Sequence, residues 1–239
     1  MEPRATLETR SRSFYDRAAP TYDEAMGTPV ARALRECFWH RAEAELPPGS
    51  RVFDFGAGSG LDAEHLAERG RTVTAYEPSA GMLSLLRTRC AAAIAAGSVV
   101  PLGGTFAELE HALAGKPPFD GVVCNFAVLS MVPRLDPVFR LFGRVTRPGG
   151  RVLISIQNPW YPGDLRSRAF WKALLGFPAN GVLRFHGTET GYTNHYLPSQ
   201  VRRAARPEFR RRPDGDWPTC CRRSFGLLRT FRLIVLERA

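Results

Sequence analysis

The sequence predicts an α/β protein in which helices cover both faces of a doubly wound, mostly parallel sheet of seven strands. Short apolar runs alternate with segments whose apolar residues recur at helical spacing, and such runs are typical of strands buried on both faces. The first run, 51–55, leads at once into a glycine-rich loop and then into a helical pattern. A chain that leaves a strand and exposes bare backbone to a ligand needs glycines at this point.

Length and composition predict one soluble globular domain. The chain has 239 residues, 44% of them hydrophobic and 23% charged, and no apolar run reaches the roughly 18 residues of a membrane helix. The basic N-terminus has no apolar core behind it, so we expect no secretory signal and a cytoplasmic protein. The five cysteines are an odd number without CxxC spacing, which predicts reduced thiols and no metal site. The oligomeric state stays open.

The net charge of +10 raises the question of a nucleic-acid partner. The arginines are spread along the whole chain, however, and the densest groups fall within 202–212 and 222–223. A solvated basic face accounts for this distribution better than a binding patch does, so we regard nucleic acid as an unlikely partner.

The N-terminal half predicts helices and strands in alternation. A short helix within 11–26 is expected to break at Pro20, and a second helix covers 29–46. The first strand, 51–55, is followed by a helix over 61–69, a strand over 72–76 and a helix over 80–96 that Ser79 caps. A weaker strand over 98–102 precedes a helix from Thr105 to Leu113.

The second half continues this alternation and then departs from it. A fourth strand begins at 119–123, an amphipathic helix covers 135–146, the segment RPGG forms a turn, and a fifth strand covers 152–156. The stretch 158–196 is rich in aromatic residues and is predicted to be an insertion that packs on itself or covers a pocket. A helix over 198–205 and strands over 209–212 and 231–236 complete the chain.

The glycine loop by itself is compatible with several nucleotide cofactors. Gly58, Gly60 and Ala63 satisfy a permissive GxGxxA pattern, so NAD, FAD and S-adenosylmethionine all remain open. Glu77 ends the second strand, beside the first loop, where a carboxylate accepts hydrogen bonds from both ribose hydroxyls. Because that carboxylate would repel a 2′-phosphate, NADP is disfavoured.

Four motifs in order resemble those of the class I S-adenosylmethionine-dependent methyltransferases. VFDFGAGSG resembles their first motif, AYEPSAGML the second, FDGVVCNFAVLSMVP the fourth, and RPGGRVLIS the turn that follows. The opening FYDRAAPTYDE is similar to the lid of the subgroup that acts on small molecules, including the quinone-methylating enzymes. The resemblance implies a Rossmann-like fold with a helical lid (1–46), a cofactor-binding core (50–157), a substrate cap (158–196) and a C-terminal helix and strand pair (197–239).

The resemblance also implies which residues bind S-adenosylmethionine. Asp54, Gly56, Ala57, Gly58 and Gly60 would surround the methionine part, Glu77 and Pro78 the ribose, and Met82 the adenine. Asn125 and Phe126 would lie near the methionine part, and Tyr22 would close over the cofactor. This family often has an acidic residue beside the adenine where this chain has Thr105, so the contact falls to Phe106, Ala107 or Glu108.

Methyl transfer from a sulfonium chiefly requires that the acceptor be aligned and water excluded. A general base is needed only if the acceptor loses a proton as it attacks. His195 and His186 are the candidates for that base, with Glu189 and Tyr192 behind them. Trp160, Tyr161, Tyr192 and Tyr196 are candidates for the acceptor wall, although Trp160, Tyr161 and Trp171 equally suit a small core of the insertion.

The predicted activity is therefore transfer of a methyl group from S-adenosylmethionine to oxygen, nitrogen or carbon of a small organic acceptor, with S-adenosylhomocysteine as product. An RNA or DNA methyltransferase is the first alternative, favoured only by the positive charge and lacking an NPPY or DPPY run. A non-catalytic protein that keeps the fold and binds the cofactor structurally is the second.

Overall fold

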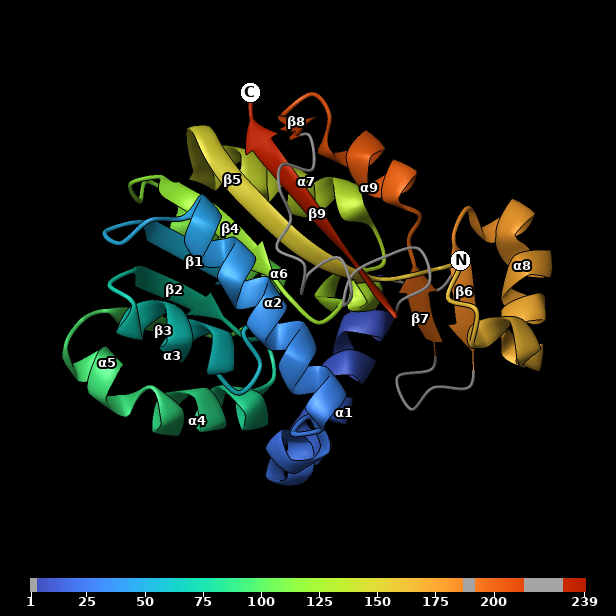
Figure 1. The fold of residues 1–239 in the computed structure, drawn as a ribbon, viewed down its shortest axis with the longest axis horizontal. Helices are drawn as coiled ribbons and strands as arrows, with labels where there is room; N and C mark the ends of the chain where they lie inside the picture. Colours follow the sequence, from blue (N-terminus) through green and yellow to red (C-terminus); the bar gives the residue numbers. More distant parts are fainter. Residues whose placement is uncertain (1–3, 187–191, 213–229) are drawn as a thin grey trace.

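Seven strands form one sheet in the order β3-β2-β1-β4-β5-β9-β8. The computed structural model describes residues 4–186, 192–212 and 230–239. The strands are β1 (Arg51–Phe55), β2 (Thr72–Tyr76), β3 (Val99–Leu102), β4 (Phe119–Cys124), β5 (Thr146–Gln157), β8 (Phe209–Arg211) and β9 (Phe231–Arg238). β1 to β5 pair in parallel, whereas β9 runs antiparallel to both β5 and β8 (Figure 1). The predicted doubly wound, mostly parallel sheet is confirmed.

Helices cover both faces of this sheet, and each face has its own core (Figure 1). The helices around the sheet are α2 (Pro29–Glu45), α3 (Leu61–Glu68), α4 (Ala80–Arg89), α5 (Ala91–Ala95), α6 (Phe106–Leu113), α7 (Leu135–Val145) and α9 (Pro198–Ala205). Successive side chains of a strand point to opposite faces, so Val52 joins the core with α2 and α3 while Phe53 joins the core with α6 and α7. The apolar runs read in the sequence are thus buried on both sides.

Three local details differ from the predictions. Helix α1 (Arg4–Ala25) continues through Pro20, because it packs along α4, where Asp16 hydrogen-bonds to Ser79. The single helix expected over 80–96 is divided at Cys90, whose thiol lies 3.7 Å from the Gly60 carbonyl. The RPGG segment, expected to be a turn, lies inside β5, where the register with β4 shifts.

The insertion after β5 forms a separate small unit at the right-hand end of the molecule (Figure 1). It contains the 3-10 turn η2 (Asp164–Arg166), helix α8 (Arg168–Asn180) and a two-stranded antiparallel sheet of β6 (Leu183–His186) and β7 (Tyr192–His195). The unit is joined to the loop after β4, which includes the turn η1 (Val128–Met131), because the Tyr196 hydroxyl donates to the Val132 carbonyl at 2.7 Å. Sequence patterns did not resolve this hairpin.

Within the described ranges, no helix combines the length and the apolar character that crossing a membrane requires. The same residues contain no group of three or more His, Cys, Asp or Glu side chains placed to hold a metal ion.

Candidate functional site

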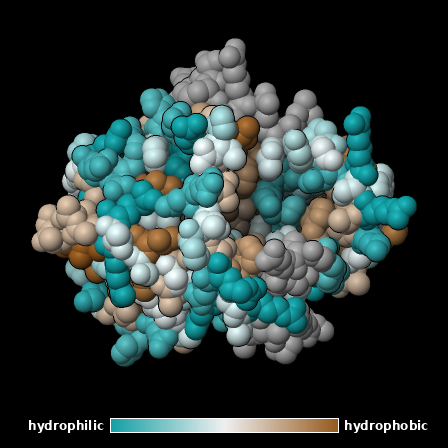
Figure 2. Space-filling view, turned by 90° about the horizontal axis from the view of Figure 1, so that it is seen from below, coloured by the Kyte–Doolittle hydropathy of each residue, from teal (hydrophilic) through white to brown (hydrophobic). Residues whose placement is uncertain are grey.

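A cavity lies at the carboxyl edge of the parallel strands, between the ends of β1, β2 and β4 and the overlying helix α1. Figure 2 views the molecule from the side of α1 and shows a hollow near the middle of this face, with hydrophobic side chains beside it. Eleven of the fourteen residues predicted to bind the cofactor line this central cavity: Tyr22, Gly56, Ala57, Gly58, Glu77, Pro78, Met82, Thr105, Phe106, Asn125 and Phe126. Three of the four motifs, which follow β1, β2 and β4, therefore meet at this edge of the sheet, whereas no residue of RPGGRVLIS lines the cavity.

The glycine loop after β1 is shaped by positive backbone angles and close packing. Gly56 has φ +82°, and a Cβ there would lie 2.5 Å from the Val128 side chain. Gly58 has φ +57°, and its Cβ would meet the Met82 methyl group at 3.6 Å. The backbone N–H groups of Gly56 and Ala57 both donate to the Tyr76 carbonyl at 2.9 Å, which fixes the loop against the end of β2. These positions require glycine because a side chain is excluded at Gly56 and unfavourable at Gly58.

Glu77 connects the glycine loop to the start of α4. Its two carboxylate oxygens accept backbone hydrogen bonds from Gly58 and Ser79, each at 2.9 Å. The side chain is 6% exposed, and burial raises the pKa of Glu77 to about 7, although the two hydrogen bonds act in the opposite direction. Glu77 therefore keeps lone pairs that can accept hydrogen bonds from a ligand at the cavity wall, although burial destabilises its charged form.

Two further carboxyl groups lie close together near the cavity: Asp62 lines it, and Asp54 is buried next to Asp62 and Glu77 without lining it. Asp54, on β1, is 1% exposed, and Oδ2 of this side chain has no hydrogen-bond partner among the residues described. Burial, followed by the charges of Asp62 and Glu77, raises the pKa of Asp54 well above its usual value. Arg35 is the cation that offsets this potential. The arrangement favours a ligand that carries positive charge or several hydroxyl donors.

Asp62 is the centre of a hydrogen-bond network in the wall of the cavity. One carboxylate oxygen accepts from Arg35 at 3.0 Å and from the Trp39 indole at 2.7 Å, and the other accepts from the Asn125 amide at 3.0 Å. The Asn125 carbonyl oxygen accepts in turn from the Ser155 hydroxyl at 2.7 Å. The network therefore ties α2, α3, β4 and β5 together at the site.

The loop after β4 holds two non-glycine residues in the left-handed region. Phe126 has φ +51° and Ala127 has φ +59°, a conformation that costs L-residues roughly 1 kcal/mol each. The Asn125 side chain accepts from the Phe126 N–H at 2.8 Å, and the Ala127 N–H donates to the Ser155 carbonyl at 3.1 Å. The Arg35 guanidinium lies 4.4 Å from the Phe126 ring centre. These contacts fix the strained loop, so that Phe126 forms part of the cavity wall.

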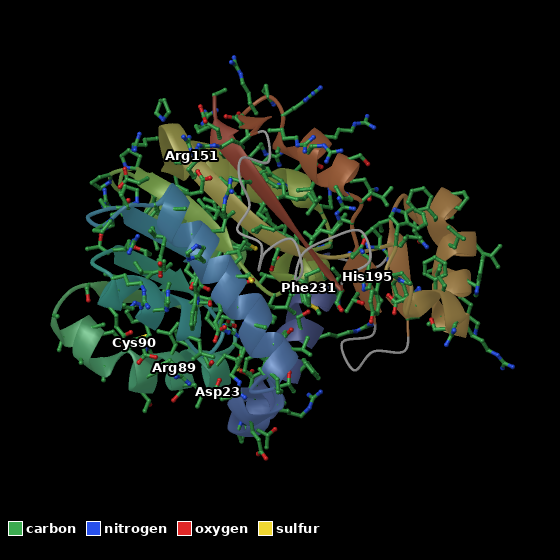
Figure 3. All side chains as sticks on the ribbon, in the orientation of Figure 1. Asp23, Arg89, Cys90, Arg151, His195 and Phe231 are labelled. Atoms are coloured by element: carbon green, nitrogen blue, oxygen red, sulfur yellow. The ribbon has the colours of Figure 1, made fainter. Side chains whose placement is uncertain are left out.

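Helix α1 is attached over the cavity at two carboxylates. Asp16 accepts from the Ser79 hydroxyl at 2.7 Å and from the Gly81 N–H at 3.0 Å, and these bonds lower the pKa of Asp16. Asp23 accepts from the Ser59 hydroxyl at 2.5 Å and forms an ion pair with Arg89, as Figure 3 shows for the labelled side chains. α1 is therefore bound to both the glycine loop and the first turn of α4.

The inner face of α1 presents aromatic and polar groups to the cavity. Burial raises the pKa of Tyr15 to about 12, with a further contribution from the charge on Glu77, and burial also raises the pKa of Tyr22. Both phenols thus stay protonated at neutral pH. The Ser11 hydroxyl and Arg12 Nε line the cavity and lack hydrogen-bond partners within the described part of the chain. They are donors available to a ligand.

Comparison with known proteins places this arrangement in a family. Residues 22–193 match the family model described as "Methyltransferase domain". The chain belongs to the methyltransferase-domain family. Demethylmenaquinone methyltransferase of Mycobacterium sp. (strain KMS) is 32% identical over 157 residues, which cover 63% of this chain and 62% of that protein. The demethylmenaquinone methyltransferase of M. tuberculosis (strain ATCC 25618 / H37Rv) is also 32% identical, and the match covers 63% of this chain and 61% of that protein.

Solved structures support the same fold. CcbJ methyltransferase from Streptomyces caelestis has a TM-score of 0.65 at 20% identity, covering 93% of this chain and 96% of that one. The 1,6-didemethyltoxoflavin-N1-methyltransferase of Burkholderia thailandensis also has a TM-score of 0.65, at 16% identity, covering 100% and 92%. At these identities the likeness establishes the methyltransferase fold alone.

Three residues predicted to bind the cofactor lie outside the cavity lining of this methyltransferase domain. Asp54 lies beneath it on β1. Gly60, at φ +88°, instead allows close helix packing, since a Cβ would lie 2.9 Å from the Leu86 side chain. Ala107 is exposed on α6. Thr105, which stands where an acidic residue was expected, lines the cavity and caps α6 in a capping box with Glu108.

The predicted catalytic and acceptor residues of the insertion do not line the central cavity. His195 is buried in β7 and stacks on Phe185 with ring centres 4.1 Å apart; Nδ1 of the imidazole has no hydrogen-bond partner in the described ranges. Burial lowers the pKa of His195 to about 4. Figure 3 shows His195 well away from Asp23 and Arg89. His186 is exposed at the end of β6.

The aromatic candidates of the insertion likewise serve other contacts. Tyr192 and Tyr196 are buried in and after β7, Tyr161 is half-buried, and Trp160 is 44% exposed. Trp160 and Trp171 both contact Phe170, at ring-centre distances of 6.5 and 5.5 Å. Glu189, Cys220 and Cys221 lie outside the described residues.

Sequence reasoning missed several residues that shape the cavity: Arg12, Tyr15, Arg35, Asp62 and Ser79. The signal for Asp62 was its place four residues after Gly58, in the first turn of α3. Tyr15 belongs to the FYD segment of the lid motif, and Ser79 follows Glu77 by two residues. No local pattern predicted Arg35, because its role depends on how α2 crosses α3.

Proposed function

We propose that this chain transfers a methyl group from S-adenosylmethionine to oxygen, nitrogen or carbon of a small organic acceptor. The observation that carries the proposal is the cavity itself, in which Glu77, Asp62 and the glycine loop meet under α1. Membership of the methyltransferase-domain family supports it. The buried reduced thiols of Cys90 and Cys124 suit a cytoplasmic enzyme.

The residues present fit this cofactor in charge and in hydrogen bonding. Glu77 would accept from the ribose hydroxyls, and Met82 and Phe106 would contact the adenine. Asp54 and Asp62 are the carboxyl groups that would stabilise a sulfonium and an amino group, and Oδ2 of Asp54, which has no hydrogen-bond partner among the described residues, fits a ligand that donates or carries positive charge. The pKa of Glu77, raised by burial, is consistent with a site built to receive such a ligand.

The chain contributes mainly alignment and exclusion of water. The bound cofactor supplies an activated methyl group whose leaving group is a neutral thioether. Tyr15 and Tyr22 cover the cavity from α1 and stay protonated, so they act as hydrogen-bond donors and as aromatic walls rather than as bases. Because none of the cavity-lining residues described is a histidine, we propose that positioning carries catalysis and that a histidine base is not required.

The cavity lining includes a group of apolar side chains, which we propose as the acceptor side. These are Val128, Met131, Val132, Pro133 and Val138. Such a wall suits a flat or hydrophobic acceptor, and the mycobacterial relatives are named for demethylmenaquinone, a quinone. The match covers 62% of that relative's length, so a quinone-like acceptor is what we propose for this chain and does not follow from the relative's name.

Two measurements test the proposal. Calorimetry should show S-adenosylmethionine binding to the wild-type chain and strong weakening in Glu77→Ala, with the exposed Glu68→Ala as control. Incubation with a panel of quinols, phenols and amines should then release S-adenosylhomocysteine with at least one acceptor. A wild-type chain that binds no cofactor refutes the proposal, and binding without turnover by any acceptor, including mixed oligonucleotides, favours the non-catalytic alternative.

A further inference from the structure

The cap insertion exposes large hydrophobic side chains in one place. Among the described residues, the exposed large hydrophobic side chains are Val30, Val100, Trp160, Leu165, Trp171 and Leu175. Four of these six fall within the sixteen residues 160–175, and Leu175 is 82% exposed. Single exposed hydrophobic residues are ordinary, but a cluster of two indoles and two leucines indicates an interaction surface.

The four side chains belong to one surface, here called the cap patch. Trp171 and Leu175 stand four residues apart on α8 and so share a face. The Trp171 indole donates to the Leu165 carbonyl at 2.9 Å, which places η2 against that face. Trp160 and Trp171 both contact Phe170, so the two indoles lie on either side of one ring-packing contact. The opposite side of α8 is already used, because Phe170 and Ala173 are 1% and 2% exposed. The cap patch is therefore a second apolar face on a helix that is already packed.

Three exposed cations lie between Leu165 and Leu175 in the chain. Arg166, Arg168 and Lys172 are all exposed, and none of them takes part in an ion pair within the described ranges. Asp164 is the only acidic residue in the segment 158–186. Figure 2 shows hydrophilic and hydrophobic residues adjoining at the right-hand end of the molecule, where α8 lies in Figure 1. Positive charge beside exposed Trp and Leu is complementary to a surface that is anionic outside and apolar beneath.

We propose that the cap patch docks peripherally on an anionic lipid bilayer. Trp171, Leu175 and Trp160 would enter the interfacial region while Arg168 and Lys172 contact lipid headgroups. An acidic protein surface alone would pair with the cations but would not bury the indoles and leucines. The headgroup boundary of an anionic bilayer does both, because anionic headgroups lie directly above an apolar layer. The proposal concerns where the protein binds and does not depend on which reaction the central cavity performs.

Vesicle co-sedimentation of the full chain tests the docking. Binding is expected to vesicles of phosphatidylcholine mixed with phosphatidylglycerol, and much less to phosphatidylcholine alone. Trp171→Ser/Leu175→Ser should abolish binding, whereas Val30→Ser/Val100→Ser, which removes the exposed hydrophobic residues elsewhere, should not. Each cation removed in Arg168→Gln/Lys172→Gln should weaken binding about fivefold. The matched control Arg203→Gln/Arg210→Gln, on exposed arginines away from the patch, should change it little.

The remaining outcomes contradict the proposal. The proposal is overturned if the wild-type chain binds neither kind of vesicle. It is also overturned if every variant binds as the wild type does, because binding would then reflect the net charge of +10 alone. A concentration-dependent dimer that Trp171→Ser/Leu175→Ser disrupts, with no vesicle binding, would assign the patch to a second copy of the chain. Tryptophan emission provides an independent readout, because Trp160 and Trp171 should shift to shorter wavelength on anionic vesicles only.

Discussion

Replacing Glu77 by glutamine should stabilise the empty protein and weaken cofactor binding at the same time. Burial raises the pKa of Glu77 from 4.5 to about 7, so the folded chain holds this proton more tightly than the unfolded chain. A tenfold difference in proton affinity is worth about 1.4 kcal/mol, so a charged Glu77 lowers the free energy of unfolding by about 3 kcal/mol above pH 7. This destabilisation fades as the pH falls from 7 to 4.5, because the carboxyl is then protonated in the folded state.

Urea denaturation at pH 8 and pH 4.5 measures the effect. At pH 8 the free energy of unfolding of Glu77→Gln should exceed that of the wild type by up to about 3 kcal/mol, and at pH 4.5 the two should agree. Affinity for S-adenosylmethionine should fall about 10- to 100-fold, since hydrogen bonds to a charged group are worth roughly 1.5–3 kcal/mol. The exposed Glu68→Gln serves as the control that should change neither quantity.

The opposite stability result would refute this reasoning. If Glu77→Gln is less stable than the wild type at pH 8, then the backbone hydrogen bonds from Gly58 and Ser79 outweigh the burial of the charge. If the variant is more stable but binds the cofactor as tightly as the wild type, the carboxylate does not contact the ribose.

Three further variants test the loop, the lid and the insertion. Gly56→Ala should abolish cofactor binding, measured by calorimetry, because its Cβ would lie 2.5 Å from Val128. Gly97→Ala is the control: Gly97 has φ +74° with open space around it, so the variant should lose only about 1 kcal/mol of stability in denaturation and keep its cofactor binding. Asp16→Ala should raise the cofactor dissociation rate several-fold in stopped-flow experiments, because the bonds between α1 and α4 are lost. His195→Gln should remove the decrease in stability that the buried His195 alone contributes between pH 6.5 and 4, which urea denaturation across this pH range measures.

The fold was predictable because its signals are local. The apolar run 51–55, the glycines after it and the helix after them are contiguous, so spacing alone predicts strand, loop and helix. Glu77 was predictable for the same reason, since the end of the second strand must lie beside the first loop in a doubly wound sheet. The cofactor side of the cavity follows from these two elements.

The rest of the cavity depends on contacts between distant segments. Asp62 is joined to Arg35 and Asn125, which lie 27 and 63 residues away in the chain, and no spacing rule predicts that meeting. The insertion was read from composition only, so its aromatic and histidine residues were predicted to belong to the site, whereas Tyr192 and His195 are buried in β7 and His195 stacks on Phe185. Likewise, Pro20 predicted a break that the packing of α1 on α4 overrides.

Glu77 and His195 should contribute to the pH dependence of stability with opposite signs. The folded-state pKa of Glu77 is raised, so the contribution of Glu77 to stability increases as the pH falls from 7 to 4.5. The folded-state pKa of His195 is lowered to about 4, so the contribution of His195 decreases as the pH falls from 6.5 to 4. Each change is about 3 kcal/mol. Where the two pH ranges overlap, the two contributions therefore offset each other in the wild type. Glu77→Gln should lose stability on acidification and His195→Gln should gain it, and similar slopes in both variants would show that these groups do not control the profile.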